Sequence, residues 1–114
     1  MSKRSDMDLI DDILISIEKI ELYIKEIDYD KFTDDPKTQD AVIRNIEIIG
    51  EAVKKLSEEI RLEYSSIPWK AIAGTRDRLI HGYFGVNIDI VWDISTKDLS
   101  AIKREIQSIK RISN

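Results

Sequence analysis

The sequence predicts an all-α fold, an antiparallel helical bundle of four main helices plus a short fifth one. Apolar residues recur at steps of three and four along most of the chain, which keeps them on one face of a helix. No stretch alternates apolar and polar residues with the period of two that a strand requires. With 35% charged residues and only 2 Pro among 114 residues, the composition suits helices. Residues 1–114 are long enough for one helical domain with one core.

We expect the first helix over residues 6–27. Aspartates crowd its first turns, where the positive end of the helix dipole favours carboxylates. A polar connection over residues 28–38 follows, in which Asp35 can cap the next helix and Pro36 can occupy its first position. The apolar face of the first helix is formed by Ile10, Ile13, Ile17, Ile20, Ile24 and Ile27.

The second helix is predicted over residues 37–60. Gly50 interrupts it at a cost of about 1 kcal/mol relative to Ala, which is tolerable where a neighbouring backbone packs close. Ile43 and Ile48 fall off its apolar stripe, and two interpretations stay open: scattered exposed aliphatics or a self-association surface. The stripe consists of Val42, Ile46, Ile49, Val53, Leu56 and Ile60.

The remaining helices are predicted from turn-forming and capping residues. Pro68 can open a third helix that runs to Ile80, and Gly82 and Gly85 end it. Asn87 can cap a short fourth helix over residues 88–93.

Ser95 or Thr96 can start the last helix, because either hydroxyl can accept a hydrogen bond from a backbone N–H of a first turn. Its apolar spacing is formed by Leu99, Ile102, Ile106, Ile109 and Ile112.

Composition excludes several classes of function. The chain has no Cys, which excludes disulfides, thiolate metal sites and a cysteine nucleophile. No run approaches a membrane span and the N-terminus does not resemble a signal peptide, so we expect a cytoplasmic protein that does not bind membranes. The net charge of −4 argues against a nucleic-acid binder, and we expect no DNA partner, although residues 1–60 carry a net −7 and residues 61–114 a net +3. An anionic ligand is therefore expected at the second half.

The stretch from Gly74 to Gly85 collects rare residue types, among them the only histidine, His81. Asp77 lies four residues before it and Arg78 three, so both would neighbour His81 on a helix. A carboxylate at that spacing can orient the imidazole and raise its pKa. Arg76 lies five residues before His81, about 140° round an ideal helix, so the two side chains can flank an object as wide as a phosphodiester.

This set of residues could support metal-independent RNA cleavage. His81 suits the role of general base or acid, and the guanidinium of Arg76 suits the phosphate. Arg78 is a further candidate for a phosphate contact. One histidine is too few for a mechanism with two, and a symmetric dimer would supply the second.

Structural interpretations compete with this one. A lone His followed by Gly at a helix end commonly caps the helix, and an Arg-Asp-Arg run is usually a solvated face. The residues predict no metal site, because there is one His, no Cys and no cluster of inward carboxylates. No phosphate loop or dinucleotide fingerprint is present, and we expect no cofactor.

The motif Arg76-x4-His81-Gly82-Tyr83 resembles the Arg-x4-His-x-Tyr signature of HepT-like proteins in the HEPN superfamily. The resemblance extends to three flanking stretches, which resemble the family's second, third and fourth helices. These stretches are residues 44–57, 67–83 and 91–94.

The resemblance implies a HEPN bundle, usually a homodimer, that acts as the ribonuclease toxin of a toxin–antitoxin pair. Arg76 and His81 would be the catalytic pair, and Asp77 fills a position that is often polar and would orient the histidine. The antitoxin would be a minimal nucleotidyltransferase that transfers AMP to Tyr83. Since some HEPN domains are not nucleases, a non-catalytic module that binds and regulates a nucleotidyltransferase is the alternative.

Overall fold

The computed structural model describes residues 5–79 and 85–113, apart from the side chains of Arg76 and of residues 111–113. This part of the chain is all helical, as predicted, and contains no strand. Its elements are α1 (Asp6–Ile24), α2 (Tyr29–Thr33), α3 (Pro36–Lys55), α4 (Glu58–Glu63), α5 (Trp69–Ala73), α6 (Thr75–Leu79), α7 (Ile88–Asp93), the π-helix η1 (Ile94–Asp98) and α8 (Leu99–Ser113).

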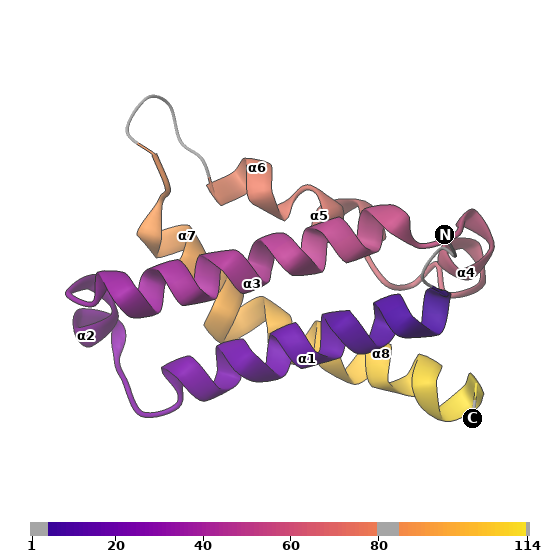
Figure 1. Cartoon of the computed structure of the whole chain (residues 1–114), viewed down its shortest axis with the longest axis horizontal. Coiled ribbons are helices and arrows are strands. Elements are labelled where there is room, and N and C mark those ends of the chain that lie inside the picture. Colours follow the sequence, from indigo (N-terminus) through magenta and orange to yellow (C-terminus); the bar gives the residue numbers. More distant parts are fainter. Residues whose placement is uncertain (1–4, 80–84, 114) are drawn as a thin grey trace.

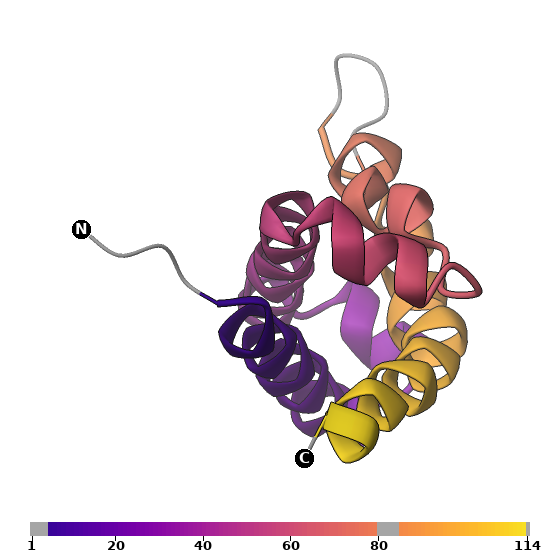
Figure 2. The ribbon, with the colours of Figure 1, turned by 90° about the vertical axis from the view of Figure 1, so that its right-hand side faces the viewer.

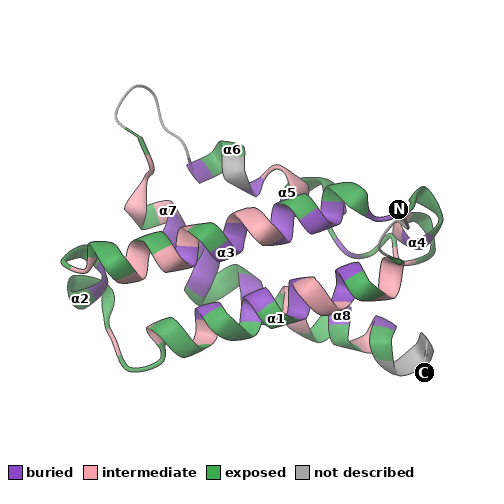
Figure 3. Ribbon diagram, viewed as in Figure 1, coloured by how far each residue is buried: buried purple, intermediate pink, exposed green. Residues whose placement is uncertain are grey.

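The elements form an antiparallel bundle. α1 and α3 run side by side in opposite directions, α5 and α6 return along α3, and α7 with α8 comes back beside α1 (Figure 1). Viewed from the end, these four segments surround a common interior (Figure 2). Buried residues line the faces that turn inwards, and exposed residues cover the outside (Figure 3).

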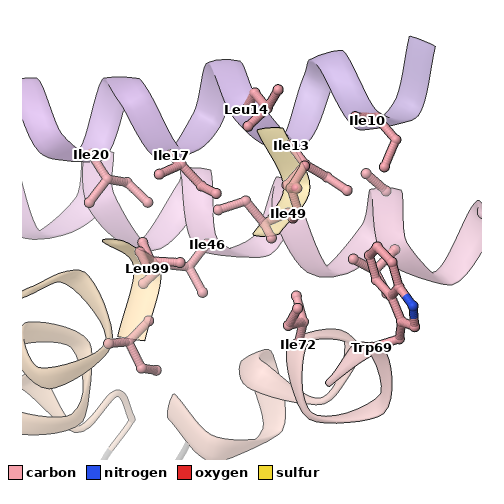
Figure 4. Packing of buried hydrophobic residues seen from close by; sticks show 14 of the residues in the cluster. Ile10, Ile13, Leu14, Ile17, Ile20, Ile46, Ile49, Trp69, Ile72 and Leu99 are labelled. Carbon is pink, nitrogen blue, oxygen red and sulfur yellow. The ribbon is translucent and has the colours of Figure 1, made fainter. Parts of the chain in front are cut away.

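The core is mostly aliphatic. The isoleucine stripe predicted on the first helix is confirmed, since Ile10, Ile13, Ile17 and Ile20 are fully buried. Figure 4 shows these side chains above Ile46 and Ile49 of α3, with Ile72, Trp69 and Leu99 closing the other side. Each such side chain contributes roughly 1.5–3 kcal/mol when fully buried.

The beginnings of α1 and α3 follow the capping rules. Ser5 and Asp8 form a capping box at α1, in which each side chain accepts from the backbone N–H of the other residue. Asp35 caps α3 and Pro36 stands at its first position, as predicted. The first predicted helix ends three residues early, at Ile24 rather than at residue 27.

The second predicted helix was wrong at its end. α3 stops at Lys55, and the backbone turns extended at Leu56 with a ψ of 145°. Ser57 then caps α4 by accepting from the N–H of Ile60, and its own N–H donates to the carboxylate of Asp6 at 2.9 Å. These hydrogen bonds replace those that a continuous helix would make.

Gly50 does mark a close packing of backbones. A Cβ placed on this residue would lie 3.4 Å from the carbonyl oxygen of Ala73 and 3.6 Å from that of Ile72. α3 and α5 therefore approach each other through the missing side chain. This contact explains why a glycine is tolerated in the middle of a long helix.

The third predicted helix is divided in two. Gly74 caps the end of α5, and α6 begins at Thr75. The Thr75 hydroxyl donates to the carbonyl oxygen of Ile72 at 2.7 Å, so the break is itself hydrogen-bonded. The predicted end at Gly82 lies outside the described residues.

The short helix predicted over residues 88–93 is confirmed, with Asn87 as its cap. The predicted start of the last helix was wrong. Ser95 and Thr96 cap nothing, since their hydroxyls donate back to the carbonyl oxygens of Val91 and Trp92, at 2.8 and 2.7 Å. Because those hydrogen bonds run within a helix, the chain passes from α7 through η1 into α8 without a loop.

Candidate active site on α6

α6 carries three of the predicted site residues on one short helix. Thr75 and Leu79, four residues apart, are buried at 8% and 1% exposure and hold the helix against the bundle. Asp77 and Arg78 lie between them and are exposed. The backbone of Arg76 lies in the same helix. α6 therefore exposes one acidic and one basic side chain to solvent, while its buried residues hold the helix against the bundle.

The backbone of α6 is held at both ends. The N–H groups of Asp77 and Arg78 donate to the carbonyl oxygen of Gly74, at 3.1 and 3.3 Å. The N–H of Asn87 donates to the carbonyl oxygen of Leu79 at 2.7 Å. This last bond joins the two sides of residues 80–86, so the start of α7 lies beside the end of α6.

His81 and Tyr83 lie outside the described residues. The predicted neighbour relations of Asp77 and Arg78 with His81, and the flanking position of Arg76, therefore stay predictions. What the structure adds is the placement of the residues on either side of them.

α7 is fixed by aromatic residues of α2. Trp92 packs on Tyr29 and Phe32, with ring centroids 6.2 and 5.1 Å apart. The Tyr29 hydroxyl donates to the carboxylate of Asp89, and this hydrogen bond raises the pKa of Tyr29 above its ordinary value of 10.0. α7, which follows the motif, is therefore attached to α2, at the end of the bundle where the chain passes from α1 to α3.

Arg78 faces charged residues from η1. Its guanidinium lies 3.9 Å from the carboxylate of Asp98, in an ion pair whose two side chains are about half exposed. Lys97 pairs with Asp93 at 3.2 Å. Sequence analysis missed the proximity of Asp98 to Arg78, because these residues are twenty positions apart. They meet through the packing of α6 on α7, which continues into η1.

A cavity of about 300 Å³ lies beside this ion pair. We call it the α6–α8 groove, and define it by Ile46, Ile49, Pro68, Ala71, Ile72, Thr75, Arg78, Ile94, Lys97, Asp98, Leu99, Ala101, Ile102 and Glu105. Its floor is apolar, and its charged residues come from α6, η1 and α8. No sequence pattern pointed to it, since its walls are far apart in the chain.

The described residues contain neither a group of metal ligands nor a membrane-spanning helix. Within residues 5–79 and 85–113, no three His, Cys, Asp or Glu residues are grouped so that they could hold a metal ion. No helix in this part of the chain is both long and apolar enough to cross a membrane.

Comparison with known proteins identifies the family. The family model described as "Ribonuclease HepT-like" matches residues 13–109, most of the chain. The chain belongs to the HepT-like ribonuclease family. The matched range includes all of α3, most of α1 and of α8, and the whole motif from Arg76 to Tyr83. The family resemblance stated from the motif is thereby confirmed.

Curated HepT-like relatives cover nearly all of the chain. A protein of Thermococcus cleftensis named "Probable ribonuclease HepT" is 40% identical over 109 residues, 96% of this chain and 99% of its own length. A protein of Methanocaldococcus jannaschii named "Putative RNase" is 42% identical over 109 residues, 96% of this chain and 90% of its own. A "Putative RNase" of Caldanaerobacter subterraneus is 45% identical over 86 residues, 75% of this chain and 77% of its own.

No solved structure gives a significant match to the chain. Membership of a ribonuclease family implies an RNA substrate. The HepT-like assignment therefore supports ribonuclease as the general activity of the protein.

Proposed function

We propose that this HepT-like protein is a metal-independent endoribonuclease, the toxin of a toxin–antitoxin system. The observation that carries the proposal is the ribonuclease family match across residues 13–109, which includes the spacing Arg76-x4-His81-x-Tyr83. The exposed positions of Asp77 and Arg78 on an anchored α6 support it, because a site for a polymer must be open to solvent.

The proposed roles follow from the chemistry of each side chain. In the proposed step the ribose 2′-oxygen attacks the adjacent phosphorus, and the bond from phosphorus to the 5′-oxygen breaks. One copy of His81 takes the proton of the 2′-hydroxyl and a second copy gives a proton to the leaving 5′-oxygen, while Arg76 stabilises the charge that develops on the phosphoryl oxygens. Asp77 orients His81, and Arg78 contacts a neighbouring phosphate. In this proposal the 2′-hydroxyl is the nucleophile and Arg76 neutralises the phosphoryl charge, so no role is assigned to a metal ion.

The active unit in this proposal is a homodimer. A general base and a general acid are both needed, and each chain has one histidine. A two-fold axis close to α6 would bring two copies of His81 to one phosphodiester. The active site would then be shared between two chains.

The antitoxin in this proposal is a nucleotidyltransferase that AMPylates Tyr83. Tyr83 stands two residues after His81. An attached AMP would bring negative charge and bulk next to Arg76 and His81, and would compete with RNA for the same cations. Modification would therefore switch off the nuclease without unfolding the bundle.

The decisive experiment measures RNA cleavage by purified protein in excess chelator. Wild type should cleave, and His81→Ala and Arg76→Ala should each lose about a hundredfold or more, the usual contribution of acid–base and oxyanion groups. Arg44→Ala, which removes an exposed arginine from α3, is the matched control and should keep full activity.

Equal cleavage by all four proteins would indicate a contaminating nuclease and contradict the proposal. The alternative, a non-catalytic module that regulates a nucleotidyltransferase, is favoured by the net charge of −4 and the single histidine. It predicts a tight complex with that partner and no cleavage by wild type.

A second experiment tests modification. Co-expression with the proposed nucleotidyltransferase antitoxin should add the mass of AMP to the peptide that contains Tyr83, and Tyr83→Phe should abolish the addition. Tyr23→Phe, which alters an exposed tyrosine on α1, serves as the control. An unmodified Tyr83 peptide under these conditions would count against the antitoxin mechanism.

A further inference from the structure

The α6–α8 groove is an open slot between two walls of the bundle. Buried Ile46 and Ile49 of α3 form its floor, while Ala71 of α5 and Ala101 of α8 line its sides and are exposed. Both alanines have small side chains, so the space between the helices is left unfilled. At about 300 Å³, the cavity has the size of a small-molecule site.

The rim of the groove carries both signs of charge. Arg78 and Lys97 supply cations, and Asp98 and Glu105 supply carboxylates. The Arg78–Asp98 pair at 3.9 Å is loose and half exposed, so both groups can take other partners at little cost. A ligand that fits must have an apolar body, hydrogen-bond donors on its edge and an attached anion.

Arg78 joins this groove to the candidate active site. It lies on α6 with Arg76 and Asp77, and its side chain lines the groove. A group bound in the groove is therefore close enough to α6 to be covalently linked to a phosphate that is bound there. Among the parts of an RNA chain, the base of a nucleotide next to the cleaved phosphodiester meets that condition.

We propose that the α6–α8 groove binds one base of the RNA, and so sets the sequence preference of cleavage. The inference rests on the proposed ribonuclease function and deepens it. The flat faces of the base lie between the aliphatic side chains of the two walls, and the phosphate lies towards Arg78. Single-stranded RNA is recognised in this way, by splayed bases that are held on their faces and edges.

The carboxylates decide which bases are preferred. Asp98 and Glu105 accept hydrogen bonds, so they favour a base that carries an exocyclic amino group. Cytosine, adenine and guanine have such a group and uracil does not. We expect cytosine to bind better than uracil, since the two are of equal size and differ mainly at that edge.

A second copy of the chain is the competing occupant. A stable interface between proteins buries about 800 Å² on each partner. The groove is a narrow slot with four charged residues at its rim, whereas the centres of protein interfaces are depleted of charge. These features favour a base.

The test is a titration of ¹⁵N-labelled protein with CMP and with UMP, followed by amide chemical shifts. Wild type should shift at residues of α5, η1 and α8, and should bind CMP roughly fivefold or more tighter than UMP. Ala101→Leu fills the slot and should weaken CMP binding about tenfold or more, the usual scale of a base contact. Ser100→Leu adds the same bulk at the neighbouring exposed position, outside the groove lining, and should bind like wild type.

Two further variants keep the test sharp. Ala71→Leu fills the slot from the opposite wall, and should also weaken CMP binding if Ala101→Leu should fail to fold. Asp98→Ala combined with Glu105→Ala should remove the difference between CMP and UMP. Unchanged CMP binding in both leucine variants would overturn the inference. The inference would also be overturned if the leucine variants lost a dimer that wild type forms, as measured by light scattering, while their affinity for CMP stayed unchanged. That result would assign the groove to a second copy of the chain.

Failure of this inference can be told apart from failure of the ribonuclease proposal. If wild type binds CMP in the groove but cleaves no RNA, the base site stands and the nuclease proposal falls. If wild type cleaves RNA and Ala101→Leu cleaves it at the same sites with the same relative rates, the nuclease proposal stands and the base site falls.

Discussion

The α1–α3 pair and the segment from α5 to α8 are built differently. α1 and α3 are long, of 19 and 20 residues, and are capped at their first residues by Ser5 and Asp35. The other half is interrupted at Gly74 between α5 and α6 and passes through a π-helix before α8. Its first and last elements still bury Trp69, Ile106 and Ile109 in the common core. The interruptions lie beside the candidate site.

This difference indicates that the two regions have different roles, one in forming the core and the other in forming the site. The continuous pair supplies much of the buried core, and α1 carries six acidic side chains and one basic one. The interrupted half carries Arg76 and Arg78, and it contributes most of the residues that line the groove. Breaks in a helix release backbone and side chains from regular packing, which a site needs and a core does not.

The largest expected effect is on the continuous pair. Ile17→Ala removes a fully buried side chain from α1 and should lower the free energy of unfolding by roughly 2–5 kcal/mol. Ile15→Ala, two residues away and 51% exposed, should change it by less than about 0.5 kcal/mol. Urea denaturation followed by circular dichroism measures both. Similar losses in the two variants would show that α1 is not buried as described.

The contact between the two regions is tested at Gly50. Gly50→Leu would push its side chain against the carbonyl oxygens of Ala73 and Ile72, and should cost about 1–3 kcal/mol of stability. Gly50→Ala should be tolerated, because its Cβ would lie at ordinary contact distance and Ala gains up to about 1 kcal/mol in helix propensity. Thermal melts of the two variants decide. A stable leucine variant would contradict the close approach of α3 and α5.

A smaller effect is expected on the site side, and on binding rather than folding. Arg78→Ala removes a half-exposed ion pair, so the melting temperature should hardly change. If Arg78 contacts a phosphate, RNA affinity should fall several-fold and the slope of log affinity against log salt should decrease by about one. Arg44→Ala is the control for a general loss of positive charge. An equal effect of the two variants on binding would remove the assigned role of Arg78.

The smallest effect is on the pH dependence of α3. The carboxylate of Asp35 accepts from the hydroxyl and the N–H of Thr38, at 2.6 and 3.1 Å, and these hydrogen bonds lower its pKa below 3.8. Because the folded pKa is lowered, the stabilisation is present above the unfolded pKa and is lost as pH falls through the folded one.

Asp35→Asn keeps a good capping residue without a titrating group. Its melting temperature should match wild type near pH 7, and should fall less steeply than that of wild type below about pH 4. Asp40→Asn, an exposed position on the same helix, is the control. Parallel acid curves for wild type and Asp35→Asn would contradict the lowered pKa.

Much of the fold follows from local rules that operate within a few residues. The buried face of α1, the cap at Asp35 with Pro36 after it, and the short helix capped by Asn87 were all predicted and confirmed. Isoleucine spacing and capping chemistry act over one or two turns, so the sequence alone reveals them. The motif likewise identified the ribonuclease family that the comparison then showed.

Tertiary contacts decided part of the rest. Ser57 ends a long helix because the carboxylate of Asp6, 51 positions earlier, takes its N–H and hydroxyl. At Ser95 and Thr96 the deciding contacts are local, since both hydroxyls bond carbonyl oxygens of the previous turn. The sequence was ambiguous there, because Ser and Thr can either cap a helix or make this hydrogen bond inside one.

The sequence by itself determined that this protein is an all-α bundle of the HepT-like family, with its rare residues gathered between Gly74 and Gly85. Only the tertiary structure decided that Arg78 meets Asp98 and that both stand at the rim of an apolar groove. Spacing on one helix can be read from the chain. Which helices then face each other depends on how the whole core packs, and that is not written in any one segment.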